Sequence, residues 1–170
     1  MEPHLTPAQT TSWHFVGSAS TFPNITAEDG KKLSEQYPCS GSAQVGCRVF
    51  NIPQTGSEAY EADLEDDVLP KELKDQVLIF QYKGKFHAVD HKCPHSSYPL
   101  SQGTPFDIED FGVVLSAGIM CPKHDWSFDI FTGMADRNAY RLKIWDVEVR
   151  EPPEVGKDKE VWVRRKPRMG

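Results

Sequence analysis

Two short Cys-His pairs constrain this chain of 170 residues more than any other feature of its sequence. The first pair is Cys93-Pro94-His95 and the second is Cys121-Pro122-Lys123-His124, with 25 residues between them. Each pair follows a strand-like stretch, so we expect both on loops at strand ends, where a rigid sheet can hold them together. The two pairs use half of the four cysteines and a third of the six histidines, which indicates a shared role.

Three interpretations of these loops compete. In the first, each cysteine is a small buried apolar residue and each histidine a surface residue, with no common role. The second is a tetrahedral zinc site, although structural zinc sites usually take two cysteines from one segment and two histidines from another. The third is a cluster of two irons, one bound by both cysteines and the other by both histidines. This third interpretation suits two loops that each supply one sulfur and one nitrogen, because the two ligands of one loop then reach different irons.

The remaining sequence predicts an all-β fold. Its clearest element is a hairpin over residues 76–90, in which two apolar runs meet at Lys83-Gly84. Further alternating segments end at turn residues, and we expect about eight or nine mostly antiparallel strands. These segments span residues 13–18, 46–53, 111–120, 126–133, 141–150 and 159–166, with 141–150 paired to 159–166.

Two polar stretches interrupt the strand pattern. Residues 26–44 favour a helix over 27–37, and residues 53–75 favour a short helical turn near 70–75. We expect both stretches to be insertions on the surface of the β scaffold.

Charge and hydropathy exclude several classes of protein. The net charge of −6 argues against a general nucleic-acid binder. No apolar run approaches the roughly 20 residues of a membrane span, and the N-terminus lacks the pattern of a secretory signal, so we expect a cytoplasmic protein. Acidic residues gather at 58–67 and 106–110, as either solvated loops or a docking surface for a basic partner.

The ligand pattern Cys-x-His followed by Cys-x-x-His resembles that of Rieske [2Fe–2S] proteins. The stretch "WHFVGS" resembles the opening strand of that family, and "WSFDIFTG" resembles its usual continuation after the second pair. The resemblance implies a single Rieske domain over 1–170, with an antiparallel β sandwich or barrel-like base at about 13–87 and 133–166. The two loops then form a small cluster-binding subdomain at about 88–132.

The resemblance also implies a [2Fe–2S] cofactor and its ligands. Cys93 and Cys121 would bind the buried iron, and His95 and His124 the outer iron near solvent. With four ligands assigned, His91 is expected beside the cluster or on the surface. Three further residues are expected around the cluster: Trp126, Phe128 and Ser97.

The loop residues indicate which branch of the family this chain resembles. High-potential members carry one more cysteine in each loop, joined as a disulfide, and hydroxyl residues after the second histidine. Here the other cysteines, Cys39 and Cys47, lie outside the loops, and the hydroxyl positions hold Trp126 and Phe128. Without hydroxyl bonds to sulfur the reduced cluster is less stabilised. We therefore expect a soluble ferredoxin-type protein with a potential near the low end of the family range, about −150 mV.

The implied function is one-electron transfer from a reductase, such as a flavin reductase, to an oxygenase or another acceptor. The alternative is a Rieske component of a multicomponent oxygenase or reductase enzyme, and a lesser one is a structural zinc protein. An oxygenase needs a second iron bound by two histidines and a carboxylate, and the four remaining histidines are too scattered for that site. We therefore expect a carrier rather than an enzyme. The interval between the two pairs is longer than in compact ferredoxin-type members, and we place the extra residues in an acidic extension, 103–114, beside the cluster loops.

Overall fold

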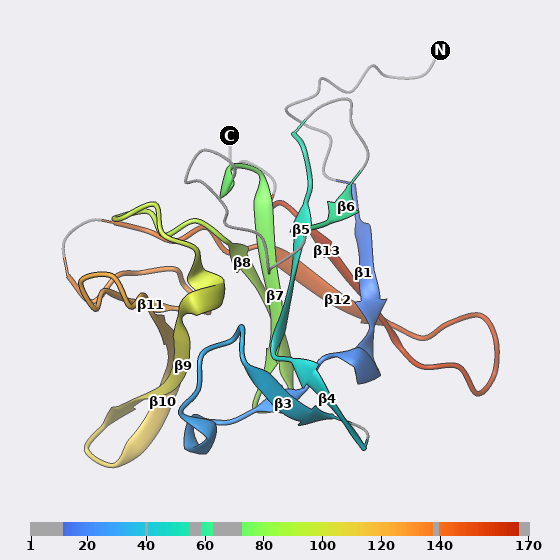
Figure 1. Cartoon of the computed structure of the whole chain (residues 1–170), viewed down its shortest axis with the longest axis horizontal. Helices are drawn as coiled ribbons and strands as arrows, with labels where there is room; N and C mark the ends of the chain where they lie inside the picture. The colour runs from blue at the N-terminus through green and yellow to red at the C-terminus, as the bar shows by residue number, and fades with distance from the viewer. Residues whose placement is uncertain (1–11, 40, 55–58, 63–72, 138–139, 167–170) are drawn as a thin grey trace.

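The computed structural model of the chain is all-β, as the sequence predicts (Figure 1). It describes residues 12–39, 41–54, 59–62, 73–137 and 140–166. The helical elements assigned within these residues are turns of 3-10 helix, at Ala19–Thr21, Ala27–Asp29 and Leu100–Gln102. In this described part of the chain, no helix has the length and apolar character needed to cross a membrane.

A five-stranded sheet lies at the centre of the fold. It contains the predicted hairpin, formed by β7 (Gln76–Tyr82) and β8 (Lys85–Asp90). Lys83 and Gly84 at the turn both have positive φ, 51° and 80°, as a two-residue hairpin turn of this kind requires. Three shorter pairings complete the sheet: β5 (Cys47–Asn51) is antiparallel to β7, β6 (Tyr60–Glu61) is antiparallel to β5, and β2 (Asn24–Ile25) is parallel to β7.

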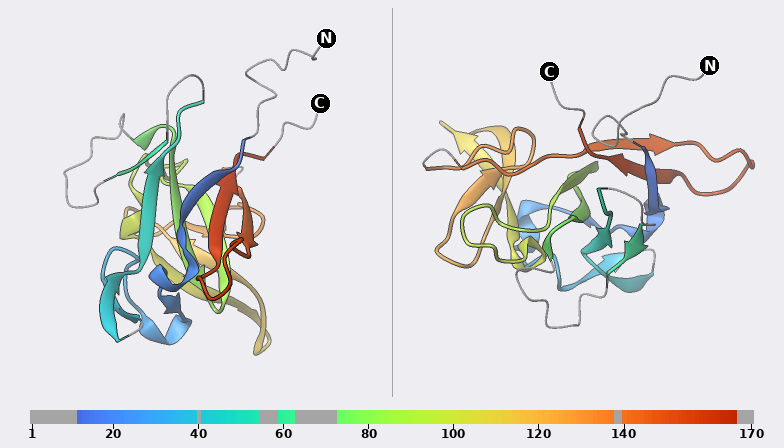
Figure 2. Two further views of the ribbon diagram at one scale, coloured as in Figure 1. Left: turned by 90° about the vertical axis from the view of Figure 1, so that its right-hand side faces the viewer. Right: turned by 90° about the horizontal axis from the view of Figure 1, so that it is seen from above.

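A second sheet covers the central one and completes a sandwich-like base. Its strands are β1 (His14–Ser18), β13 (Glu160–Arg164) and β12 (Asp146–Arg150), and Figure 2 shows β1 and β13 side by side. The predicted pairing of 141–150 with 159–166 is confirmed. Residues from both sheets fill the space between them, including Val16, Val77, Ile79, Trp145 and Val163.

A third sheet carries the second Cys-His pair. β9 (Thr104–Asp110) and β10 (Val113–Met120) form a long hairpin, and β11 (Ser127–Asp129) pairs with the end of β10. The loop that begins at Cys121 therefore connects β10 to β11. One cluster of buried side chains, the main core, joins this sheet to the central one. Its members include Leu78, Phe80, Leu100, Ile119 and Phe128. The central sheet and the two loops thus share one apolar core, separate from the one between the two sheets of the base.

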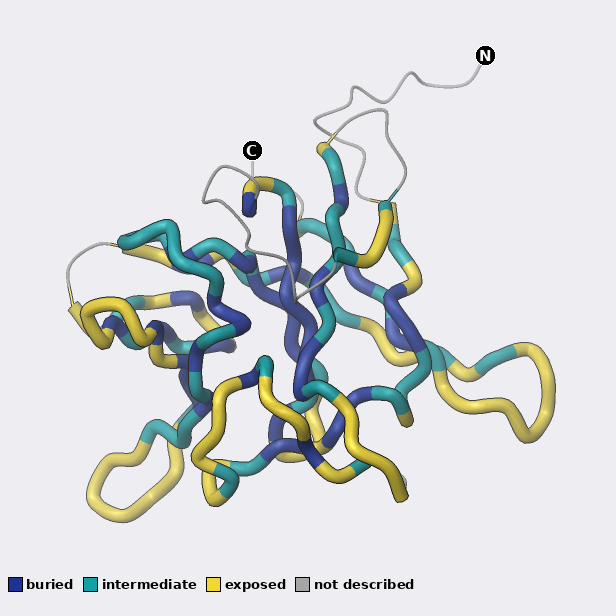
Figure 3. The backbone as a smooth tube through the Cα atoms, viewed as in Figure 1, coloured by how far each residue is buried: buried dark blue, intermediate teal, exposed yellow. Residues whose placement is uncertain are grey.

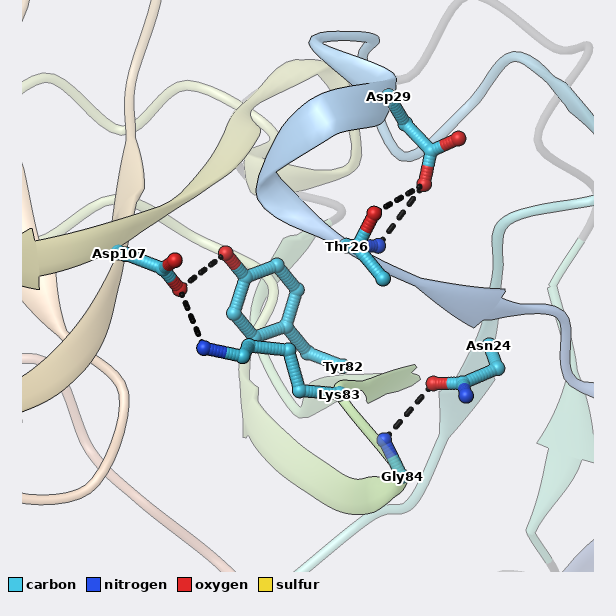
Figure 4. Close-up of polar contacts among 7 residues, drawn as sticks. All are labelled: Asn24, Thr26, Asp29, Tyr82, Lys83, Gly84 and Asp107. Atoms are coloured by element: carbon cyan, nitrogen blue, oxygen red, sulfur yellow. Dashed lines mark hydrogen bonds and ion pairs between the residues drawn. The ribbon is translucent and has the colours of Figure 1, made fainter. Parts of the chain in front are cut away.

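Residues 26–44 differ from the prediction. The expected helix over 27–37 is wrong, because Ala27–Asp29 makes a single 3-10 turn that Gly30 ends with a left-handed φ of 57°. Figure 4 shows the capping contacts at the start of this turn. A short hairpin follows, formed by β3 (Gln36–Cys39) and β4 (Ser42–Val45). The segment is not confined to the surface either, since Leu33 and Tyr37 are buried in the main core.

His87 on β8 is a buried histidine whose pKa is far from its ordinary value. Its ring stacks on Phe80, with centroids 5.5 Å apart, and meets Phe131 edge-on at 4.9 Å. Its Nε2 atom has no hydrogen-bond partner among the described residues. Burial, and to a smaller extent the charge of Lys85, lowers the pKa of His87 from 6.5 to about 4, against the opposing effect of Asp129. The unfolded chain therefore takes up a proton that the folded chain does not, so stability falls as the pH drops below about 6.5.

We expect His87→Phe to weaken this pH dependence, because phenylalanine keeps both ring contacts and carries no titrating group. Between pH 7 and pH 5, the wild type should lose about 2 kcal/mol more unfolding free energy than the variant. Urea unfolding at each pH measures the difference. An equal loss in both proteins would contradict the assignment to His87.

Candidate metal centre

Each of the two Cys-His loops is closed by a backbone hydrogen bond of the same kind. The N–H of Cys93 donates to the carbonyl oxygen of Tyr98 at 2.9 Å, and the N–H of Cys121 donates to that of Trp126 at 2.7 Å. In each loop, a cysteine is thus joined to the fifth residue after it. The two loops present their cysteines in equivalent positions although their Cys-His spacings differ by one residue.

Both loops contain residues in the left-handed backbone region. Ser97 has φ 57°, and the successive residues His124 and Asp125 have φ 70° and 56°. Residues other than glycine adopt this region at a cost of about 1–2 kcal/mol each, so the surrounding contacts must hold it. The shared core and the closing hydrogen bonds supply those contacts.

The two thiols lie together at the inner side of the loops. Cys93 and Cys121 are both fully buried and belong to the main core. Hydrogen bonding from the Cys121 thiol, and less strongly from Ser96, lowers the pKa of the Cys93 thiol. The pair therefore favours one thiolate, the form in which cysteine binds a metal.

The hydroxyl group beside the thiols comes from a residue that the sequence did not single out. Ser96 Oγ lies 3.5 Å from Cys121 Sγ. Ser97, which we expected beside the cluster, donates its backbone N–H to the carbonyl oxygen of Cys93 at 2.9 Å. Because Ser96 and Ser97 are adjacent in one loop, the sequence does not indicate which of their hydroxyl groups faces the sulfur.

The two imidazole rings form the outer pair. The rings of His95 and His124 have centroids 5.6 Å apart and are inclined by 70°. His124 is exposed, whereas His95 is partly buried. The Nδ1 atom of His95 is buried, and the described residues offer it no hydrogen-bond partner, which leaves this nitrogen available to a metal.

This donor set fits a group with two metal ions. No three His, Cys, Asp or Glu side chains of the described residues are placed to hold one metal ion together. The thiols instead neighbour each other, and the imidazoles neighbour each other. Tetrahedral zinc needs all four ligands around one ion, whereas a Rieske-type cluster needs two sulfurs on one iron and two nitrogens on the other.

Two of the residues expected around the cluster are aromatic, and both are buried here. Trp126 is 6% exposed, and its ring stacks on that of His95 with centroids 4.0 Å apart and an interplanar angle of 18°. Phe128 is 1% exposed and lies opposite Ile119 in the β10–β11 pairing. The sequence drew attention to Trp126 because high-potential family members carry a hydroxyl residue at that position. It gave no sign that the Trp126 ring contacts His95.

His91 is neither a ligand candidate nor a surface residue in the structure. It is 2% exposed, and both ring nitrogens are bonded, Nδ1 to Gln76 Oε1 and Nε2 to Ser101 Oγ, each at 2.8 Å. Because the amide oxygen of Gln76 only accepts, Nδ1 carries the proton and Nε2 accepts from Ser101. His91 therefore ties the start of the first loop to β7 and to the turn after the loop.

The acidic extension lies only partly beside the loops. Thr104 pairs with Met120 next to Cys121, but Asp110 pairs with Val113 at the opposite end of the hairpin. The expectation that 103–114 lies beside the cluster loops therefore holds for its first residues only. Within the second polar stretch, 53–75, the structure describes residues 53–54, 59–62 and 73–75. The rest of it, including most of the acidic residues 58–67, lies outside the described part of the chain.

The β9–β10 hairpin is fixed to the base at Asp107. Its carboxylate accepts a hydrogen bond of 2.7 Å from the Tyr82 hydroxyl and forms an ion pair of 3.3 Å with Lys83 (Figure 4). Burial and the Asp107 carboxylate raise the pKa of Tyr82, so the hydroxyl remains a donor. The tip beyond this anchor projects into solvent (Figure 3). Phe111, which lies between β9 and β10, is almost fully exposed.

Comparison with known proteins identifies one family. The model of the Rieske [2Fe-2S] domain matches residues 55–145. The "3-phenylpropionate/cinnamic acid dioxygenase ferredoxin subunit" of Photorhabdus laumondii is 36% identical over 89 residues, which cover 52% of this chain and 67% of that protein. A human "Rieske domain-containing protein" is 43% identical over 58 residues. The match covers 34% of this chain and 34% of the human protein, so this chain spans about a third of that relative's length.

Among solved structures, the fold resembles that of a "putative NADH-dependent nitrite reductase small subunit" from Mycobacterium tuberculosis. The TM-score is 0.50 at 13% sequence identity, and the match covers 92% of this chain and 97% of that one. A likeness at this identity concerns the fold alone.

Proposed function

This chain belongs to the Rieske [2Fe–2S] domain family, and on that premise we propose that it is a one-electron carrier that passes electrons from a flavin reductase to an oxygenase or a similar acceptor. The observation that carries the proposal is the pairing of two buried thiols with two imidazoles, one of them exposed. Relatives named as ferredoxin components of a dioxygenase and of an alkene monooxygenase system support the same role.

We assign the ligands as two inner and two outer residues. Cys93 and Cys121 would hold the inner iron, and His95, through Nδ1, and His124 would hold the outer one. Supporting this assignment are the full burial of both thiols, the lowered pKa of Cys93 and the unpartnered Nδ1 of His95.

The cluster supplies reversible storage of one electron, at potentials of about −150 to +300 mV in Rieske proteins against about −400 mV in four-cysteine ferredoxins. The residues of this chain decide how that electron is shielded and where it leaves. Cys93 and Cys121 keep the inner side dry, while the exposed His124 faces solvent and a partner. We place the potential near the low end, about −150 mV, since Trp126 and Phe128 offer no hydroxyl group to the cluster.

Ser96→Ala should lower the reduction potential further. The Ser96 hydroxyl lies 3.5 Å from Cys121 Sγ, and a hydrogen bond to a ligand sulfur favours the reduced, more negative cluster. Losing about 1 kcal/mol of that preference lowers the midpoint by about 40 mV for a one-electron couple. A dye-mediated redox titration measures the shift. Ser97→Ala is the matched control, and equal shifts in the two variants would contradict this role of Ser96.

The function is tested on protein purified without oxygen. Iron, acid-labile sulfide and zinc are quantified, and the dithionite-reduced protein is examined by electron paramagnetic resonance. We expect about two irons and two sulfides per chain and a rhombic signal with a lower average g value than four-cysteine clusters show. Catalytic reduction of cytochrome c by NADH and a flavin reductase, dependent on this chain, then supports the carrier role. Stoichiometric zinc without sulfide, or substrate turnover by the chain alone, would overturn the proposal.

A further inference from the structure

The imidazole of His95 is enclosed by two aromatic residues. Trp126 lies nearly parallel to it, with ring centroids 4.0 Å apart and an interplanar angle of 18°. Tyr140 meets the His95 ring edge-on at 5.4 Å and the Trp126 ring edge-on at 5.2 Å. Each of the three rings therefore contacts the other two. We call Trp126 and Tyr140 the aromatic cradle of His95.

Trp126 is itself held from several sides. It is 6% exposed and belongs to the main core, and its carbonyl oxygen accepts the bond that closes the second loop. The guanidinium of Arg137 lies over the indole ring, 5.0 Å from its centroid. Arg137 also donates to the carbonyl oxygen of Asp125 at 3.0 Å, so this cation is fixed to the same loop. A flat ring fixed in this way can hold a neighbouring ring in one orientation.

The two outer histidines are not supported equally. His124 is exposed, and its aromatic contact among the described residues is with His95. His95 contacts His124, Trp126 and Tyr140, and its Nδ1 is buried without a hydrogen-bond partner. In metal sites a ligating imidazole is usually oriented by a hydrogen bond at its other nitrogen. His95 instead has its ring packed against other rings, and these contacts can fix its orientation.

We propose that Trp126 is a positioning residue that holds the His95 ring in its ligating orientation by stacking, with Tyr140 as a second wall. The inference rests on the proposed function, in which His95 binds the outer iron. Trp126 touches no reacting atom in this account. It acts through the plane of His95, so what matters at position 126 is a flat ring rather than a hydrogen-bonding group.

The test compares three substitutions in this chain with its cluster bound. Trp126→Leu removes the flat ring and keeps an apolar side chain, whereas Trp126→Phe keeps a ring that can stack. Trp145→Leu is the matched control, because Trp145 is 5% exposed and lies under Arg165 at 4.6 Å but belongs to the core between the two sheets of the base. The readouts are the rate of cluster loss in chelator, followed by visible absorbance, and the resonance spectrum of the reduced protein.

Trp126→Leu should lose its cluster about tenfold faster than the wild type and show a broadened resonance signal, because the orientation of one ligand is no longer fixed. Trp126→Phe should stay close to the wild type in both measurements. Trp145→Leu should lower the unfolding midpoint while leaving the resonance spectrum unchanged. If Trp126→Leu behaves like Trp145→Leu, or if Trp126→Phe fails as badly as Trp126→Leu, the positioning role is wrong.

A fourth variant separates failure of this inference from failure of the proposed function. His95→Ala should abolish the Rieske-type resonance signal if His95 is a ligand. Should that signal survive in His95→Ala, the ligand assignment falls and the positioning role of Trp126 falls with it. Should the signal disappear while the Trp126 variants match the wild type, the proposed function stands and only the positioning role is overturned.

Discussion

Replacing Cys93 by alanine is expected to leave a chain with less than about a tenth of the iron and sulfide of the wild type. Cys93 is fully buried, and hydrogen bonding from Cys121 already favours its thiolate. The methyl group of alanine cannot bind iron. Because position 93 is buried, solvent offers the iron no substitute for the missing ligand. Iron and sulfide analysis after reconstitution without oxygen measures the loss.

Cys47→Ala provides the control for this experiment. Cys47 is also a buried cysteine of the main core, 2% exposed. Burial raises the pKa of the Cys47 thiol, so it stays protonated and packs as a small apolar residue. We expect the variant to keep its full complement of cluster at a cost of about 1 kcal/mol in stability. Full iron in Cys93→Ala, or loss of iron in Cys47→Ala, would contradict the ligand assignment.

The features predicted correctly from the sequence are those with a local signal. The hairpin at 76–90 combines two apolar runs with a turn at Lys83-Gly84, and all the information lies within 15 residues. Strand alternation likewise located β1, β5, β10 and β13 to within two residues, whereas β12 begins five residues later than predicted. The resemblance to the Rieske family rests on a local signal too, since the spacing within each Cys-His pair depends on neighbouring residues alone.

The features that the sequence did not reveal depend on contacts between distant segments. Leu33 and Tyr37 stand in a polar stretch, and nothing near them indicates that both side chains reach the main core. His91 is bonded to Gln76 and Ser101, 15 and 10 residues away, and only the folded chain brings these partners together. The stacking of Trp126 on His95 joins the two loops across 31 positions for the same reason.

The helix expected over 27–37 shows how tertiary structure overrides local preference. The segment has helix-favouring residues, but Gly30 interrupts them after one turn and adopts a left-handed φ. Beyond it, backbone N–H groups of Leu33 and Ser34 donate to the carbonyl oxygens of Gly103 and Ser101, each at 2.9 Å. These bonds attach the segment to the turn that follows the first Cys-His loop. A helix could not make them, because its N–H groups would be bonded internally.

Gly133→Ala is expected to destabilise the fold by at least about 3 kcal/mol. Gly133 has φ 80°, and its two backbone groups are both used: its N–H donates to Asp129 at 2.8 Å, and its carbonyl accepts from Leu142 at 2.7 Å. A Cβ atom at this position would overlap the carbonyl oxygen of Leu142. The backbone would have to move, and the turn after β11 would separate from the segment that leads to β12.

Gly84→Ala separates the two causes of this effect. Gly84 has the same φ of 80°, but a Cβ atom there meets no atom within 4 Å. Its substitution should therefore cost only the backbone strain, about 1 kcal/mol. Urea unfolding measures the free energy of unfolding of both variants. Because both positions have the same φ, the difference between the two losses reports the contact with Leu142 and not the backbone conformation. If the two variants are equally stable, the backbone near Gly133 can move at no cost, and the contact with Leu142 does not contribute to stability.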